Sequence, residues 1–208
     1  KGNYRHFMQK EIFAQPDAIT SILSGRHNHG HILDQAFGRN ATAIFNKVQN
    51  VIFVACGSSY YAGLVARNWV ESMAGIPCQV EIASEFRYRK RVVPKNTLFV
   101  TISQSGETAD TIAALNDLKN DPSDTYVGTL TVCNVPESTL MRSSDLVLLT
   151  HAGPEIGVAS TKGFMTQLVG LFMLSLALGR RFNLGADAEA ELVAQLTQLP
   201  TIINEYLK

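Results

Sequence analysis

Thr101-Ile102-Ser103-Gln104-Ser105-Gly106-Glu107-Thr108 is the stretch that decides the fold of this chain. It follows the apolar run Leu98–Val100 and precedes Ala109–Lys119, whose residues favour a helix, so the order predicts a strand, a turn and a helix. Gly106 lets the backbone approach a ligand, and the helix directs unpaired N–H groups and its positive dipole end at the turn. These features predict an oxyanion site, typically for phosphate, with hydrogen-bond donors from Ser103, Gln104, Ser105 and Thr108.

Helix capping is the alternative interpretation of the same residues. Ser and Thr are favoured at helix N-caps with or without a ligand, and one N-cap explains one of these side chains, or two. The four hydroxyl or amide groups around Gly106 exceed what capping needs. We therefore favour the anion site over the cap.

Composition limits the class of protein. A chain of 208 residues, 46% of them hydrophobic, is long enough for one sizeable core. Its 18 basic and 18 acidic residues cancel, so no overall field favours nucleic acid or an anionic membrane. We expect neither partner, and local geometry must hold any anion that binds.

The cysteines and the apolar segments predict a cytoplasmic protein. Cys56, Cys78 and Cys133 are scattered, without the spacing of a zinc site, so we expect reduced thiols and no metal. No signal peptide is expected at the start, because residues 1–10 are polar and mixed in charge. The apolar window Leu168–Leu178 contains Ser175 and is too short for a membrane span, which predicts a buried helix.

Apolar runs alternate with helical segments along the chain. Strands are expected over 51–56, 78–83, 98–103, 126–133 and 146–150. Helices are expected over 7–23 with a break at Pro16, over 32–48, 57–73, 109–119 and 164–178, and over 188–207 with an interruption at Pro200. This order predicts an α/β three-layer sandwich with a five-stranded parallel sheet in the flavodoxin-like order.

A second glycine-rich turn supports a single site. Gly57, Ser58 and Ser59 lie between the first strand and its helix, as residues 103–108 lie after the third strand. In the flavodoxin-like order these two strands are neighbours at the switch point of the sheet. We therefore expect both turns to face one crevice.

Other polar stretches have structural explanations. The histidine-rich run Gly25–His31 is expected to be a solvated loop rather than a metal tract. The basic run Ser84–Arg91 is expected to be a solvated helix face or a subunit contact. In the loop 151–162, Ser160 and Thr161 could cap the next helix, or the loop could fold over a ligand.

The chain resembles, over essentially its whole length, the first sugar isomerase (SIS) domain of the glucosamine-6-phosphate synthase family. The motifs that carry the resemblance are Tyr4–Ile12, Cys56–Tyr60, Glu81–Arg89, Ser103–Thr111, Cys133–Val135 and Glu155–Lys162. The resemblance implies the SIS fold and an enzyme that makes glucosamine 6-phosphate from fructose 6-phosphate, with ammonia released from glutamine in a separate domain.

The same resemblance implies roles for individual residues. Ser103, Ser105 and Thr108 would hold the sugar phosphate with help from Gln104, and Ser59 would meet the phosphate or sugar from the facing turn. Val158 and Ser160 would contact the sugar from the last loop. Gly57, Ser58 and Gly106 would support these binding residues. No cofactor is implied. No catalytic residue is expected in this chain, because the general base, the ring-opening histidine and the Schiff-base lysine of the family belong to the second SIS domain, its carboxyl-terminal tail and a neighbouring subunit.

The family comparison also predicts the organisation of the chain. Residues 1–30 would be an arm from a glutaminase domain, 31–185 the SIS domain, and 186–208 a helix leading toward a second SIS domain. The chain would thus be a fragment, inactive alone, and a homodimer. One alternative is a regulatory SIS module that senses a sugar phosphate, although no helix-turn-helix segment precedes the domain and such a module has no reason to carry Glu155–Lys162. A nicotinamide dehydrogenase is disfavoured because Gly57-Ser58-Ser59 is not GxGxxG.

Overall fold

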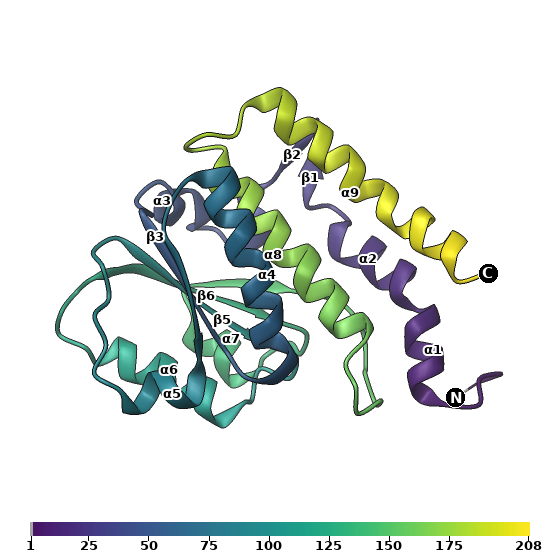
Figure 1. Ribbon diagram of the computed structural model, residues 1–208, viewed down its shortest axis with the longest axis horizontal. Helices are drawn as coiled ribbons and strands as arrows, with labels where there is room; N and C mark the ends of the chain where they lie inside the picture. Colours follow the sequence, from purple (N-terminus) through teal and green to yellow (C-terminus); the bar gives the residue numbers. More distant parts are fainter. Residues whose placement is uncertain (1) are drawn as a thin grey trace.

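A five-stranded parallel sheet forms the centre of the protein, seen in a computed structural model that describes residues 2–208. The strands lie in the order β4-β3-β5-β6-β7 (Figure 1). Their bounds are β3 Asn50–Ala55, β4 Cys78–Ile82, β5 Thr97–Ser103, β6 Tyr126–Cys133 and β7 Leu146–Leu149. The predicted strands and the flavodoxin-like order are confirmed.

The central strand β3 is buried on both faces because its residues alternate between two cores. Val51 and Phe53 belong to one hydrophobic cluster, whereas Ile52 and Val54 belong to the other. This alternation follows from the two-residue period of a strand, and a continuous apolar run satisfies both faces of a parallel sheet. The sheet can therefore be covered by helices on both sides.

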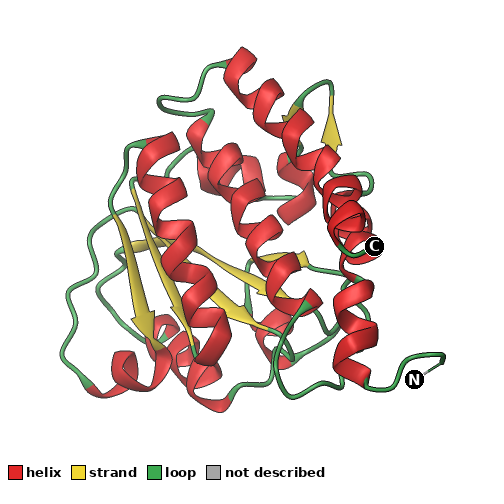
Figure 2. Ribbon diagram, turned by 45° about the vertical axis from the view of Figure 1, so that its right-hand side comes forward, coloured by secondary structure: helices red, strands yellow, loops and turns green. Residues whose placement is uncertain are grey.

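Helices cover each face of the sheet (Figure 2). The larger core lies under α4 (Gly57–Ala74) and α8 (Lys162–Gly179), which pack against each other. The opposite face is covered by α5 (Ala83–Tyr88), α6 (Ala109–Lys119) and the short α7 (Thr139–Ser143), which was not predicted. The three-layer sandwich is therefore confirmed.

A further group of helices lies outside α8. It consists of α1 (Phe7–Phe13), α2 (Gln15–Leu23) and α9 (Ala186–Tyr206). Helix α2 packs between α8 and α9, which places both ends of the described chain on the same side of the molecule (Figure 1). The predicted break near Pro16 is confirmed, because the chain turns there from α1 into α2.

Two predicted elements differ from the structure before the first strand of the main sheet. The histidine run is not a plain loop but a hairpin of β1 (His27–Asn28) and β2 (His31–Ile32). The single helix expected over 32–48 is also wrong, because the segment forms the 3-10 helix η1 (Asp34–Phe37) and the short helix α3 (Ala41–Phe45). Gly38 separates them with φ 131°, which only glycine adopts readily and which ends the first helix.

The interruption expected at Pro200 is wrong. Helix α9 continues through Pro200 to Tyr206. Proline removes one backbone donor, but the flanking helical hydrogen bonds remain, and this part of α9 lies against α2 beside Thr20. Packing outside α9 thus overrides the local preference of the proline.

Helix α8 is a buried core helix, as predicted, but the predicted reason, a length too short for a membrane span, does not hold. It is 18 residues long and, by length and composition, could cross a membrane. In this structure 78% of that segment is buried inside the protein. Burial, rather than shortness, identifies it as part of the core.

A buried carboxylate connects the hairpin to α8 and α9. Glu189 of α9 is fully buried and accepts hydrogen bonds from His31 Nδ1 at 3.0 Å, Ile32 N at 3.2 Å and Arg180 Nε at 3.1 Å. The histidine run therefore contributes to a structural network, and no metal-ligating cluster occurs within residues 2–208. A carboxylate with this many partners is costly to remove, because each donor loses its acceptor.

Glu189→Gln is expected to lower the free energy of unfolding by about 2 kcal/mol, because it removes the charge that pairs with Arg180 and introduces N–H groups that face donors. Glu191→Gln is the matched control, since Glu191 is exposed on the same helix and should change stability by less than about 0.5 kcal/mol. Urea unfolding of both variants measures the difference. Equal stabilities would show that the network contributes little.

Candidate functional site

The turn after β5 is closed by its own hydroxyl groups. Ser103 Oγ lies 2.9 Å from Thr108 Oγ1 and accepts the Gly106 N–H at 3.0 Å, while Ser105 Oγ accepts the Glu107 N–H at 3.1 Å. Because the Ser103 and Ser105 oxygens act as acceptors within the turn, their hydroxyl hydrogens can point away from these N–H groups. One hydroxyl hydrogen is used in the contact between Ser103 and Thr108. The turn can therefore donate to an anion without losing its shape.

The start of α6 bears on the capping alternative. Thr108 is the N-cap residue by position, yet its side chain makes no capping hydrogen bond to the helix. The hydroxyls of this turn bond to one another and to N–H groups of the turn, so capping does not account for them. The first-turn N–H groups of α6 thus point toward the turn without a side-chain cap from the described chain, which suits an oxyanion.

The second turn lies beside the first at the same edge of the sheet. Strands β3 and β5 pair in parallel with Ala55 opposite Ile102, so residues 57–59, which form the first turn of α4, and the turn at 103–108 follow at the carboxyl ends of neighbouring strands. Helices α4 and α6 then leave on opposite faces. This arrangement is the switch point expected from the sequence, the place where open α/β sheets bind their ligands.

Ser59 is oriented by a residue that the sequence did not single out. Gln167 of α8 donates from Nε2 to Ser59 Oγ at 3.0 Å, and both side chains are buried. Since Ser59 accepts this bond, its hydrogen is available to another acceptor. The Gln167 Oε1 atom is buried without a hydrogen-bond partner in the described chain, so this pair retains an unsatisfied acceptor.

The loop between β7 and α8 is organised by Glu155. Its carboxylate accepts the Ser160 hydroxyl at 3.0 Å and the backbone N–H groups of Thr161 at 2.8 Å and Gly163 at 3.1 Å. Ser160 in turn accepts the Phe164 N–H at 3.0 Å, so it caps α8 as expected. The Thr161 hydroxyl caps nothing, because Glu155 satisfies the start of the helix instead.

Asn134 joins the turn at residues 103–108, the central turn, to the loop between β7 and α8. Its backbone N–H donates to Gln104 O at 3.1 Å, and its side chain accepts the Ala152 N–H at 2.7 Å and donates to Gly153 O at 2.8 Å. Asn134 follows β6 at the same edge where the predicted residues follow β3 and β5. That position after a strand was a usable signal, although no role was predicted for Asn134.

The predicted residues therefore gather at one edge but do not form one hydrogen-bonded cluster. Ser103 and Thr108 contact each other, whereas within residues 2–208 no hydrogen bond links Ser59 or Ser160 to them. The Ser58 side chain is exposed, and Val158 projects fully into solvent from the last loop. A ligand that bridged the three segments would bring them together.

The site has little fixed charge. A hydrogen bond from the Thr139 N–H lowers the pKa of Glu107, which keeps that carboxylate ionised and bound to the start of α7. Burial, with help from nearby Arg26, lowers the pKa of His151, so its imidazole is neutral at pH 7. The Lys162 side chain is buried near Gly153 and forms no ion pair within the described chain.

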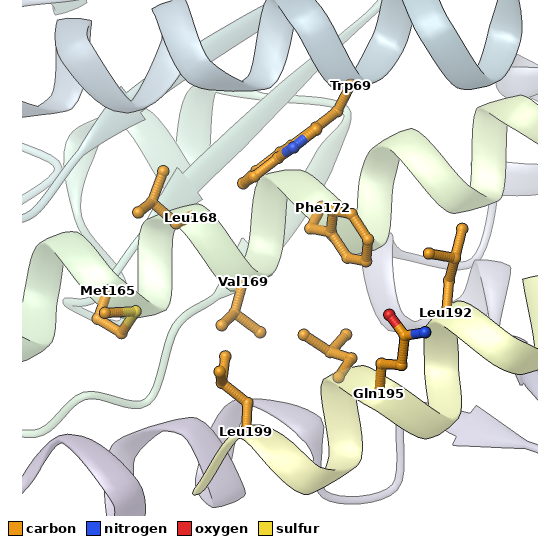
Figure 3. Close-up of a pocket in the computed structure, with 9 residues that line it drawn as sticks. Trp69, Met165, Leu168, Val169, Phe172, Leu192, Gln195 and Leu199 are labelled. Atoms are coloured by element: carbon orange, nitrogen blue, oxygen red, sulfur yellow. The ribbon is translucent and has the colours of Figure 1, made fainter. Parts of the chain in front are cut away.

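The apolar groove shown in Figure 3 is separate from these turns. It lies between α4, α8 and α9, where Trp69 packs edge-on against Phe172 at 5.0 Å between ring centroids. Gln195 is the one polar residue among those that line it. The groove therefore lacks the donors that a sugar phosphate requires.

Comparison with known proteins identifies the class. The family model of the SIS domain matches residues 44–177, which include the five strands of the sheet and both glycine-rich turns. The chain therefore belongs to the SIS domain family.

Within that family, the most informative relatives are glutamine–fructose-6-phosphate aminotransferases. The Pseudomonas putida enzyme is 61% identical over 208 residues, all of this chain and 34% of the relative. The chain spans about a third of the length of the curated relatives it matches. It thus corresponds to one SIS domain of such an enzyme.

Solved structures agree. The C-terminal domain of glucosamine-fructose-6-phosphate aminotransferase from Francisella tularensis superposes with a TM-score of 0.91 at 44% identity, covering 96% of this chain and 55% of that one. The glucosamine-6-phosphate deaminase of Thermotoga maritima shares the fold at 22% identity, with a TM-score of 0.67 over 93% of this chain and 54% of that one.

Gly106→Ala is expected to lower the free energy of unfolding by about 3 kcal/mol, because Gly106 has φ +67° and a Cβ atom there would overlap Ser138 Oγ. Gly57→Ala is the matched control, with φ +59° but open space around it, and should cost about 1 kcal/mol. Thermal and urea unfolding compare the two. A smaller loss for Gly106→Ala would mean that the turn adapts.

Cys56 is expected to react with iodoacetamide at pH 8 at least about tenfold faster than the other thiols, because burial raises the pKa of Cys78 and of Cys133 and shields both. Peptide mass spectrometry after timed quenching measures each rate. Similar rates for the three thiols would contradict the packing around β4 and β6.

Proposed function

We propose that this chain is the sugar-phosphate-binding half of the isomerase part of an enzyme that makes glucosamine 6-phosphate from fructose 6-phosphate and glutamine-derived ammonia. The observation that carries the proposal is the turn at residues 103–108, whose hydroxyls keep donor capacity beside the uncapped start of α6. The identity to glutamine–fructose-6-phosphate aminotransferases supports the choice of substrate.

In this proposal Ser103, Ser105 and Thr108 hold the phosphate, and Gln104 assists from the same turn. Ser59 donates from the facing turn, which fits the bond that it accepts from Gln167. Val158 and Ser160 contact the sugar from the last loop, and Gly57, Ser58 and Gly106 shape the turns. Neutral donors suit this task, because helix dipoles and N–H groups can hold a phosphate without an arginine.

The chain alone is proposed to bind the sugar phosphate without converting it. Isomerisation requires a general base and a ring-opening acid, and ammonia addition uses a Schiff-base lysine. We assign these groups to the parts of the enzyme beyond the third that this chain represents. Accordingly, this is the first SIS domain, with residues 1–30 as the arm from a glutaminase domain, 31–185 as the SIS domain and 186–208 as the connection to a second SIS domain.

We further propose a homodimeric, cytoplasmic enzyme. The groove of Figure 3 is consistent with a surface that another domain or subunit covers, because Trp69, Phe172 and Leu199 leave apolar area open there. The neutral overall charge gives no reason to expect nucleic acid as a partner.

Calorimetric titration with fructose 6-phosphate and glucosamine 6-phosphate tests the proposed site. The native chain should bind at millimolar concentration or better, and the double variant Ser105→Ala with Thr108→Ala should bind at least about 30-fold more weakly, because two donors to a charged group are lost. Ser123→Ala with Thr125→Ala removes another pair of contacting hydroxyls, in the loop before β6, and serves as the matched control.

Retained binding in the Ser105 and Thr108 variant would place the sugar phosphate elsewhere and leave the turn without this role. Absence of binding to the native chain would contradict the proposal as a whole. A loss in the control variant as well would indicate a general structural effect.

A further inference from the structure

A carboxylate from the N-terminal arm reaches the last loop of the proposed site. Glu11 lies in α1, and the residue is only 4% exposed. The carboxylate accepts the Ile156 N–H at 2.6 Å and the Gly157 N–H at 3.1 and 3.2 Å from its two oxygens. This contact joins segments that are about 145 residues apart in the sequence.

The loop approaches α1 closely at Gly157. A Cβ atom there would lie 2.5 Å from Glu11 Oε2 and 3.4 Å from Met8. Gly157 does not have a positive φ, so a side chain at this position would disturb the Glu11 carboxylate rather than the backbone conformation. The contacts of Gly157 with Glu11 and Met8 show that the loop lies directly against α1.

Little else fixes the tip of the loop. Ile156 is 61% exposed and Val158 is fully exposed, so neither anchors the loop by burial. Glu155 holds the following segment to the start of α8, whereas Glu11 holds the residues before Val158. Within residues 2–208 no cation pairs with Glu11, so the two N–H groups are its compensation for burial.

We propose that Glu11 is a positioning residue that holds the loop 156–158 in place, so that Val158 and Ser160 can meet the sugar. The inference rests on the proposed function. It also ties the N-terminal arm mechanically to the sugar side of the site, because a displacement of α1 would move the Ile156 and Gly157 backbone. The phosphate side depends on the central turn, which Glu11 does not touch.

The test separates the two sides of the ligand. In Glu11→Gln the shape is kept, but the charge is lost and the amide NH₂ opposes the backbone donors. Binding of fructose 6-phosphate by the 208-residue chain should weaken about tenfold, while inorganic phosphate, followed by shifts of the residue 103–108 amides in NMR titration, should bind as before. Faster hydrogen exchange at the Ile156 and Gly157 amides would accompany the change.

A second variant and a control make the test independent of folding defects. Gly157→Ala leaves Glu11 intact but forces its carboxylate away, and it should reproduce the selective loss for fructose 6-phosphate. Lys10→Gln changes one charge on the exposed side of the same helix and should leave both ligands unaffected.

Unchanged fructose 6-phosphate affinity in Glu11→Gln and Gly157→Ala would overturn the positioning role while leaving the proposed function intact. Equal weakening for both ligands would also overturn it, since a general loss of structure would then explain the effect. Failure of the native chain to bind fructose 6-phosphate would overturn the proposed function together with this inference.

Discussion

The parallel pairing of β3 with β5 is the constraint on which the rest of the structure depends. The two strands are separated in the sequence by β4, yet they lie side by side with Ala55 opposite Ile102. Right-handed crossovers then send α4 and α6 to opposite faces. The two glycine-rich turns are consequently held at one edge, and their backbone is fixed by the most deeply buried strands of the protein.

The chemistry of that edge relies on oriented neutral groups rather than on fixed charge. Ser103 and Ser105 each accept a backbone N–H of the turn, Ser103 and Thr108 share one hydroxyl hydrogen, and Ser59 accepts a hydrogen bond from Gln167. A hydroxyl whose oxygen is occupied in this way is left to act as a donor, which is the polarity that a phosphate needs. An arginine would add affinity, but it would also attract other anions and would require its own partner when no ligand is bound.

Carboxylates perform a different task in this protein, since they hold backbone segments in position. Glu189 fixes the hairpin, Glu155 fixes the start of α8, and Glu11 fixes the exposed tip of the last loop. Each accepts backbone N–H groups outside the main sheet, from the hairpin, from the start of α8 and from the exposed loop respectively. These segments are therefore held in place by buried or half-buried carboxylates.

The sequence by itself determined the sheet, its order and the two turns, because apolar runs, glycines and hydroxyls act over a few residues. It also identified Ser59 and the residues of the central turn as candidates. Only the tertiary structure decided that the segment 32–48 is broken at Gly38, that α9 continues through Pro200, and that Glu11, Asn134 and Gln167 support the site. The partners of Glu11 and Gln167 lie more than a hundred residues away along the chain, so no local pattern could reveal them.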